Sequence, residues 1–366
     1  MYKSTKSVDK VGTKGRADVT QQKTYDRATI IRRGAAVGAS LAAFGLAPRL
    51  AGAARTHSAG TTLNLVAYST PKPVLTKIIS DFQATPAGQG VSFTQSYGAS
   101  TSQAKAVIAG LPADVVFLST GDDVNLLVDA GLVNQNWDEQ GYDGIAADTV
   151  VVFALRDGNP KHIKGWDDLT RPGVQVITPN PFSSGSAKWN ILAAYGAQRH
   201  LGKTDKQAIA YVQKLFGNVV SQDTSGSNAT NTFLSGKGDV LITYESEAIN
   251  ARLQGKDIQY VIPRQTMLIE LPIAVLQGSP NKDLANKFIQ FVKSEPEQEV
   301  FGQFGFRPVN KVAAARFAKQ FPVRPGQFTI DDKTIGGWRA ANKKWFDPSN
   351  GLMVKIEQHV GGPTAG

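Results

Sequence analysis

The sequence of 366 residues contains no cysteine. A chain without cysteine cannot form disulfides, thiolate metal sites or iron–sulfur clusters, and it has no cysteine nucleophile and no cysteine for lipid attachment. Histidine is also scarce, and its four residues stand far apart, at His57, His162, His200 and His359. None of them lies in an HExxH motif or near a second ligand at metal-binding spacing. We therefore expect exposed surface histidines, no metal site and no cofactor.

Motifs of common enzyme classes are missing as well. There is no Walker loop, no GxGxxG motif after an expected strand, and no Gly-x-Ser-x-Gly elbow followed by an acid and a histidine in hydrolase order. Three carboxylates could lie near a cleft, Asp114, Glu245 and Glu247, but nothing around them suggests paired acid–base catalysis. We interpret them as structural or hinge groups and predict that the protein is not an enzyme.

The positive charge of the chain is concentrated at one end. Residues 1–55 contain eleven Lys and Arg against three Asp, a net charge of +8 out of the total of +10, so the remaining chain carries only +2. Nucleic-acid binding normally needs clustered cations. We therefore exclude nucleic acid as a partner.

The first 53 residues have the pattern of an export signal. A polar and basic stretch, residues 1–33, is followed by the uncharged run Gly34–Pro48 and by the small residues 51–53. The uncharged run is shorter than the roughly 20 apolar residues of a membrane-spanning helix, so we do not expect a permanent anchor. We predict an exported protein on the periplasmic or extracellular side of the cytoplasmic membrane, with a mature chain that begins near Ala54.

The adjacent Arg32 and Arg33, after a long leader, resemble a twin-arginine signal. Ala35 and Ala36 stand where that signal usually has larger apolar residues. Both the twin-arginine route and the general export route therefore remain open.

From Thr62 onward, short apolar runs alternate with longer helical patterns, which is typical of α/β proteins with largely parallel strands. The pattern pauses and restarts, which predicts a first lobe at 61–148, a second lobe at 149–270, and a return to the first lobe at 271–366. We expect the C-terminal helices to cover the first lobe. Two lobes imply a ligand cleft between them and hinge closure over the ligand.

Four polar turns rich in small residues stand just before expected helices. They are Ser69–Pro71, Ser96–Thr101, Ser183–Trp189 and Thr224–Thr230. The start of a helix presents unpaired N–H groups and the positive end of the helix dipole, and small residues let an anion approach closely. The same residues also cap helices in proteins that bind no anion. The residues alone thus indicate, at most, a small-anion site.

A colinear set of motifs between about residues 62 and 350 closely resembles the periplasmic sulfate and thiosulfate binding proteins of ABC importers. The motifs are Gln95–Ser100, Ala113–Val116, Arg156–Pro160, Trp166–Leu169, Val176–Asn190, Gly238–Leu241 with Glu245 and Glu247, Phe306–Val309, Phe328–Asp331 and Gly336–Trp338. The resemblance implies a two-lobed type II periplasmic-binding-protein fold, in which neutral donors hold a dehydrated tetrahedral dianion in the cleft between the lobes.

The resemblance also implies a set of binding residues. Ser100 would supply a hydroxyl or an amide from the first lobe, and Ser184, Gly185 and Ser186 would supply the start of a helix in the second. Gly226 would supply a backbone N–H. Three positions depart from the family: Tyr244 replaces a tryptophan donor, Ser69 replaces an Asp that orients other donors, and Ser227 replaces an Arg that supports the site.

A site made only of donors suits an anion without protons. Phosphate near neutral pH keeps a proton that needs an acceptor, so the resemblance implies sulfate or thiosulfate as ligand, ABC transporter permease subunits as partners and, by analogy, a monomer. Molybdate and tungstate carry the same charge at a larger radius, so a molybdate or tungstate receptor remains an alternative. A transferase of the same fold, such as the pyrrole-assembling deaminase, tethers its cofactor through a cysteine that this chain lacks.

Overall fold

The computed structural model describes residues 60–366, and the predicted export signal at 1–53 lies outside them. The strands are β1 (Thr62–Tyr68), β2 (Ser92–Gly98), β3 (Val115–Phe117), β4 (Ile145–Arg156), β5 (Val176–Ile177), β6 (Val219–Ser221), β7 (Val240–Tyr244), β8 (Ile258–Val261), β9 (Gln265–Val275) and β10 (Gly326–Phe328). The helices are α1 (Lys72–Ala84), α2 (Ser100–Ile108), α3 (Gly121–Asp129), α4 (Gly185–His200), α5 (Asp205–Phe216), α6 (Gly226–Leu234), α7 (Glu245–Leu253), α8 (Lys282–Val292), α9 (Glu295–Gln303), α10 (Lys311–Arg316), α11 (Gly337–Ala341) and α12 (Leu352–Val360), with a 3₁₀ turn at Trp166–Thr170 and a π-helical turn at Asn342–Phe346. Among these helices, none has the length and apolar character needed to cross a membrane.

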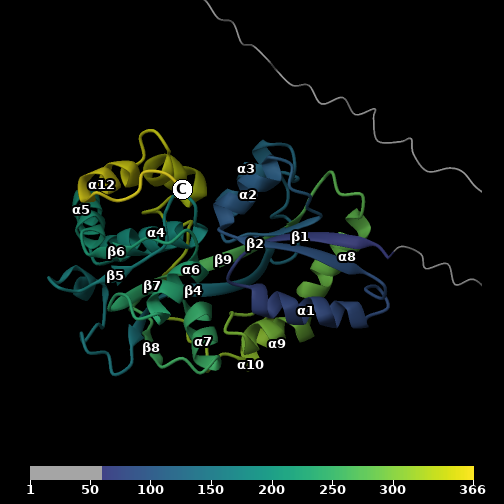
Figure 1. Cartoon of the computed structure of the whole chain (residues 1–366), viewed down its shortest axis with the longest axis horizontal. Helices are drawn as coiled ribbons and strands as arrows, with labels where there is room; N and C mark the ends of the chain where they lie inside the picture. Colours follow the sequence, from purple (N-terminus) through teal and green to yellow (C-terminus); the bar gives the residue numbers. More distant parts are fainter. Residues whose placement is uncertain (1–59) are drawn as a thin grey trace, which may run out of the picture. The chain divides into compact units, whose positions relative to one another are not determined.

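The strands form one sheet in the order β2-β1-β3-β9-β4-β7-β5-β6, with β10 beside β9 and β8 beside β4. Figure 1 shows β1 and β2 toward one end of this sheet, β5 to β7 toward the other, and β9 and β4 between them. We call β1–β3 with α1–α3 the first lobe, and β5–β7 with α4–α7 the second lobe.

Strand directions follow the prediction within each lobe but not between the lobes. β1 runs parallel to β2 and β3, and β5 runs parallel to β6 and β7. By contrast, β9 is antiparallel to β3 and β4, and β4 is antiparallel to β7. The expectation of largely parallel strands is therefore wrong at the centre of the sheet, because the chain leaves the first lobe along β4 and returns along β9.

The two long central strands are shared by both lobes. β4 pairs with β9 at Asp148↔Glu270 and Thr149↔Ile269, and its later residues pair with β7 and β8. The predicted lobe boundaries, 148/149 and 270/271, fall at these paired residues inside the strands; the boundaries themselves stay a prediction. A pair of continuous strands is an element in which small dihedral changes can move one lobe against the other.

Helix α1 shows how the sequence builds the first lobe. It follows Pro71 and has Pro73 in its first turn, where a missing N–H interrupts no helical hydrogen bond. Its apolar residues recur three and four positions apart and are buried: Val74, Leu75, Ile78, Ile79 and Phe82. Phe82 packs against Phe288 of α8 with ring centroids 5.2 Å apart. Because each large buried side chain contributes about 1.5–3 kcal/mol, this face holds α8 and α9 on the first lobe.

The last helices of the chain contact both lobes. α12 contacts α5 of the second lobe, and α11 contacts α3. Between them, Lys344 Nζ lies 2.6 Å from Asp205 Oδ1 of α5, and the Trp345 ring packs edge-on against Tyr195 of α4. The expectation that the C-terminal helices cover the first lobe thus describes only part of this segment: α11 lies against α3 of the first lobe, whereas α12, Lys344 and Trp345 find partners on α4 and α5 of the second.

Candidate functional site

All four predicted turns lead into helices. α2 begins at Ser100, α4 at Gly185 and α6 at Gly226, and the turn at Ser69 leads into α1. The first N–H groups of a helix have no partner within it, and the helix dipole makes that end positive. These helix starts therefore present backbone N–H donors, which carry no formal charge.

The hydroxyl of Ser100 is already engaged on both sides. It donates to Asp123 Oδ2 at 2.6 Å and accepts from the backbone N–H of Ser119 at 2.9 Å. Its only proton points to a carboxylate, so the hydroxyl cannot also donate to an anion. Of the two groups that the resemblance offers at this position, the amide at the start of α2 is the one left free.

The start of α4 packs directly against the first lobe. A Cβ atom at Gly185 would lie 2.9 Å from Thr120 Cγ2 and 3.0 Å from Ser119 Cβ. One turn later, the indole N–H of Trp189 donates to the carbonyl of Ser119 at 2.6 Å. The preceding residue, Ser184, is the N-cap of α4 and is buried, yet its hydroxyl does not cap the helix. Glycine is required here because the two lobes meet at this point.

Tyr244 ends β7 and is fully buried. Its hydroxyl lies 2.5 Å from the hydroxyl of Ser119, across the boundary between the lobes. Burial raises the pKa of Tyr244 far above its usual value, and hydrogen bonds from Ser119 and Ser186 offset this only in part. The phenol therefore stays neutral and can act as a donor.

The start of α6 lies against the start of α4 and near the turn Ser69–Pro71. A Cβ atom at Gly226 would lie 2.8 Å from Ser186 Oγ and 3.7 Å from Thr70 Oγ1. Next to this contact, Ser69 and Ser227 line a cavity of about 210 Å³. Through Ser119 and Ser186, the structure thus brings all eight predicted site residues into one connected region between the lobes.

The sequence pattern of bacterial extracellular solute-binding proteins matches residues 63–307 of this chain. The chain belongs to this family. A sulfate-binding protein of Synechococcus elongatus is 36% identical over 309 residues, which cover 82% of this chain and 87% of the relative. A thiosulfate-binding protein of Pseudomonas aeruginosa is 36% identical over 320 residues, which cover 84% and 94%.

A solved structure agrees with these sequence relatives. The sulfate-binding protein SubI from Mycobacterium tuberculosis H37Rv is 45% identical, covers 78% of this chain and 100% of its own, and superimposes with a TM-score of 0.75. The predicted two-lobed α/β fold of periplasmic binding proteins is therefore confirmed, as is the prediction of a binding protein rather than an enzyme. The extracellular family also agrees with export, and the type of export signal stays a prediction.

Sequence reasoning missed a buried ion pair beside the site of this solute-binding protein. Lys188 Nζ, in the first turns of α4, lies 2.7 Å from Asp122 Oδ2 and 3.5 Å from Asp123 Oδ1 of α3. Burial lowers the pKa of Lys188, but the two carboxylates raise it above its ordinary value. Asp123 also accepts from Thr101 at 2.7 Å. The only signal in the sequence was a lysine four residues after Ser184, which does not reveal its partner.

Two of the three carboxylates interpreted as structural groups make structural contacts. Asp114 accepts hydrogen bonds from Asn64 of β1 and from Ser279, which lies between β9 and α8. Glu245 pairs with Arg307 at 2.8 Å, and both side chains are buried. Glu247 differs, because it lines the same cavity as Ser69 and Ser227.

The histidines in the described part of the chain form no site. His162, His200 and His359 are exposed, as predicted, and His57 lies outside the described residues. Residues 60–366 contain no group of three or more histidines or carboxylates that could hold a metal ion.

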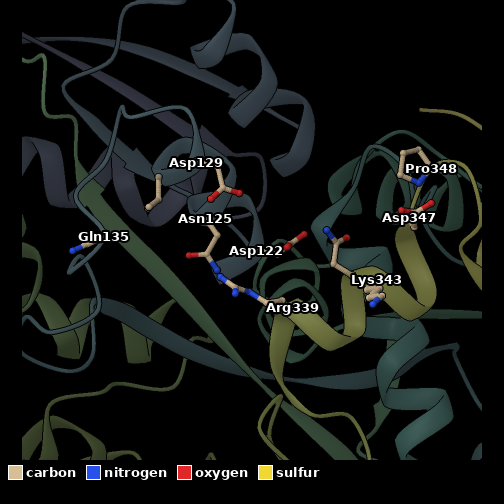
Figure 2. A pocket seen from close by; sticks show the side chains of 10 residues that line it. Asp122, Asn125, Asp129, Gln135, Arg339, Lys343, Asp347 and Pro348 are labelled. Carbon is tan, nitrogen blue, oxygen red and sulfur yellow. The ribbon is translucent and has the colours of Figure 1, made fainter.

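A second cavity, of about 580 Å³, lies between α3 and the C-terminal helical segment. Figure 2 shows Arg339 and Lys343 on that segment and Asn125 and Asp129 on α3, with the Arg339 side chain pointing toward Asn125. None of the eight predicted site residues lines it. Its walls carry charges of both signs, so it lacks the donor-only character expected of the anion site.

Proposed function

We propose that this solute-binding protein captures sulfate or thiosulfate between its lobes as a dehydrated dianion and delivers it to an ABC import permease. The observation that carries the proposal is the meeting of three helix N-termini, those of α2, α4 and α6, around Ser119 and Ser186. Its similarity to sulfate- and thiosulfate-binding proteins supports the choice of ligand.

The physical chemistry of the region favours a dianion without protons. Removing a charged group from water is very unfavourable unless hydrogen bonds replace those of water. Preorganised N–H and O–H donors offset that cost through charge-assisted hydrogen bonds. A protonated phosphate would place its own O–H against another donor, so we expect phosphate to bind far more weakly than sulfate.

We assign a role to each predicted binding residue. The backbone amides of Ser100, Gly185, Ser186 and Gly226 donate to the anion, together with the hydroxyls of Ser184 and Tyr244. The two remaining residues, Ser69 and Ser227, border the anion from the adjacent cavity. The Ser100 hydroxyl serves instead to hold the turn at Ser119, through its bonds to that turn and to Asp123.

Isothermal titration calorimetry tests the ligand. The purified protein, freed of sulfate, is titrated in turn with sulfate, thiosulfate, molybdate, tungstate and phosphate. We expect tight binding of sulfate or thiosulfate and no heat from phosphate. If only molybdate or tungstate bound, the protein would be the alternative receptor, with a wider site. If none of the five anions gave a heat of binding, the proposal would be overturned.

The partners and export route are tested separately. We propose a monomer that docks onto permease subunits after export, so cells that lack this chain should lose high-affinity sulfate uptake and keep phosphate uptake. Light scattering should give the mass of one chain with and without sulfate. Replacing both Arg32 and Arg33 by lysine blocks export if the route is the twin-arginine route and leaves it unchanged if the route is the general one.

A further inference from the structure

A buried carboxylate adjoins the proposed anion site. Glu247 is in the first turn of α7, and only 9% of its surface is exposed. Its Oε1 accepts a hydrogen bond from Ser227 Oγ at 3.1 Å. Thr70, from the turn after β1, lines the same cavity as this carboxyl, and its hydroxyl is one of three, with those of Ser227 and Thr230, that lower the pKa of the carboxyl. Thr70 lies toward the anion site, since its Oγ1 is 3.7 Å from the position of a Cβ at Gly226.

No basic side chain forms an ion pair with Glu247 among residues 60–366. Lys72 of α1 lines the same cavity, but its side chain is exposed and its Nζ lies over the Tyr97 ring. Glu245, on the same helix, is paired with Arg307. The other titratable groups that face Glu247 are the buried phenols of Tyr68 and Tyr244, which stay neutral.

Burial raises the pKa of Glu247, and the hydroxyl groups around it lower that pKa only in part. A dianion bound on the other side of Thr70 would disfavour ionisation of Glu247 and raise its pKa further, because like charges in a poorly hydrated site repel strongly. Binding of the anion and protonation of Glu247 should therefore favour each other.

The direction of the hydrogen bonds leads to the same coupling. An ionised carboxylate only accepts hydrogen bonds, so both Thr70 and Ser227 must turn their O–H groups toward Glu247. The oxygen lone pairs of Thr70 then face the anion site and repel sulfate. A protonated Glu247 can donate to Thr70, which frees the threonine O–H to point toward the anion.

We propose that Glu247 is a specificity-determining residue that takes up one proton from solvent when sulfate binds and so turns Thr70 into a donor. The inference rests on the proposed function. Sulfate carries two charges throughout the working pH range and releases no proton, so the proton comes from the buffer and ends on the Glu247 carboxyl. Affinity for sulfate should therefore fall as pH rises.

The test is calorimetric titration with sulfate between about pH 5.5 and 8.5, in pairs of buffers with different ionisation enthalpies. The difference in heat between two buffers counts the protons taken up. We expect up to about one proton per sulfate, and a Kd that rises by up to about tenfold per pH unit where Glu247 titrates. The side chain of the variant Glu247→Gln is neutral at every pH, so this variant should take up no proton. Across the whole pH range its Kd should equal the Kd that the wild type has at low pH.

A matched control is Glu297→Gln. Glu297 of α9 is also buried, and burial raises its pKa to about 7, but it lies near Asp81 and Lys77 of α1 rather than near the site. This variant should keep the proton uptake of the wild type. If exposed histidines took up the proton instead, the Glu247→Gln variant would keep the proton uptake of the wild type. That variant therefore distinguishes uptake by histidines from uptake by Glu247.

The outcomes are distinct. A wild-type protein that binds sulfate with a pH-independent Kd and no proton uptake overturns the inference and leaves the proposed function intact. So does a Glu247→Gln variant that keeps the wild-type uptake. Absence of sulfate binding at every pH overturns the proposed function itself and this inference with it. If Glu247→Gln does not fold, the number of protons that the wild-type protein takes up per bound sulfate still tests the inference.

Discussion

The hydroxyl of Tyr244 lies 2.5 Å from the hydroxyl of Ser119, and this contact joins β7 of the second lobe to the turn after β3 of the first. Both side chains are buried. A hydrogen bond between lobes exists only while the lobes are closed, so it contributes to closure rather than to the stability of either lobe.

Tyr244→Phe should therefore weaken anion binding more than it weakens folding. Losing this bond leaves a buried hydroxyl unpaired at a cost of about 1–3 kcal/mol, which corresponds to roughly 5- to 150-fold in Kd. Calorimetry measures the affinity, and denaturant unfolding without ligand measures the stability. Tyr211→Phe is the matched control, because Tyr211 donates to the carbonyl of Trp166 within the second lobe and its partner does not depend on closure. Equal losses of affinity in the two variants would contradict the account.

Ser184→Asp should abolish sulfate binding while the protein still folds. Aspartate is a good N-cap, so α4 should keep its start, but the new carboxylate would face the anion at the proposed site. Ser294→Asp makes the same change at the N-cap of α9, where the serine side chain also makes no capping bond, and should leave affinity unchanged. Circular dichroism checks folding and calorimetry checks binding. A Ser184→Asp variant that binds sulfate normally would remove Ser184 from the site.

Gly185→Ala should hold the lobes apart. The added Cβ would lie 2.9 Å from Thr120 Cγ2 and 3.0 Å from Ser119 Cβ, contacts that opening of the lobes would relieve. We expect at least about tenfold weaker sulfate binding, a loss of about 1.4 kcal/mol, and a larger radius of gyration by small-angle X-ray scattering with sulfate present. Gly278→Ala, where a Cβ meets nothing within 4 Å, is the control. A compact, tightly binding Gly185→Ala variant would show that the lobes do not close at this point.

Lys188→Met tests the buried ion pair. It leaves Asp122 and Asp123 without their cation, and breaking a buried pair in this way costs about 3–5 kcal/mol. Because this pair joins the two lobes, denaturant unfolding with sulfate present, when the lobes are closed, should show that loss. Adding Asp122→Asn should restore part of it, since one buried charge is then removed. A single variant as stable as the wild type with sulfate bound would contradict this role of the pair.

Much of this protein follows from local sequence signals. The helices α2, α4 and α6 begin at Ser100, Gly185 and Gly226, where small polar residues precede apolar periodicity, so their starts could be predicted. At α2 the N-cap itself is Ala99, whose side chain cannot cap a helix, so the signal there comes from the polar residues that follow it. The parallel pairing within each lobe also follows from alternating strands and helices.

What could not be predicted depends on pairing across long sequence separations. The antiparallel centre of the sheet arises because β4 and β9, more than a hundred residues apart, run side by side in opposite directions. The ion pair of Lys188 with Asp122, the contact of Ser119 with Tyr244 and the placement of Glu247 beside Thr70 arise in the same way. No local pattern marks such partners, since each residue alone resembles an ordinary cap or surface group.

The most direct test of the central claim is a crystal structure of the protein with sulfate. The account predicts one sulfate between the lobes, within hydrogen-bond distance of the backbone N–H groups of Gly185, Ser186 and Gly226, with no lysine or arginine in contact with it. A sulfate bound elsewhere, or one held by a basic side chain, would contradict the account.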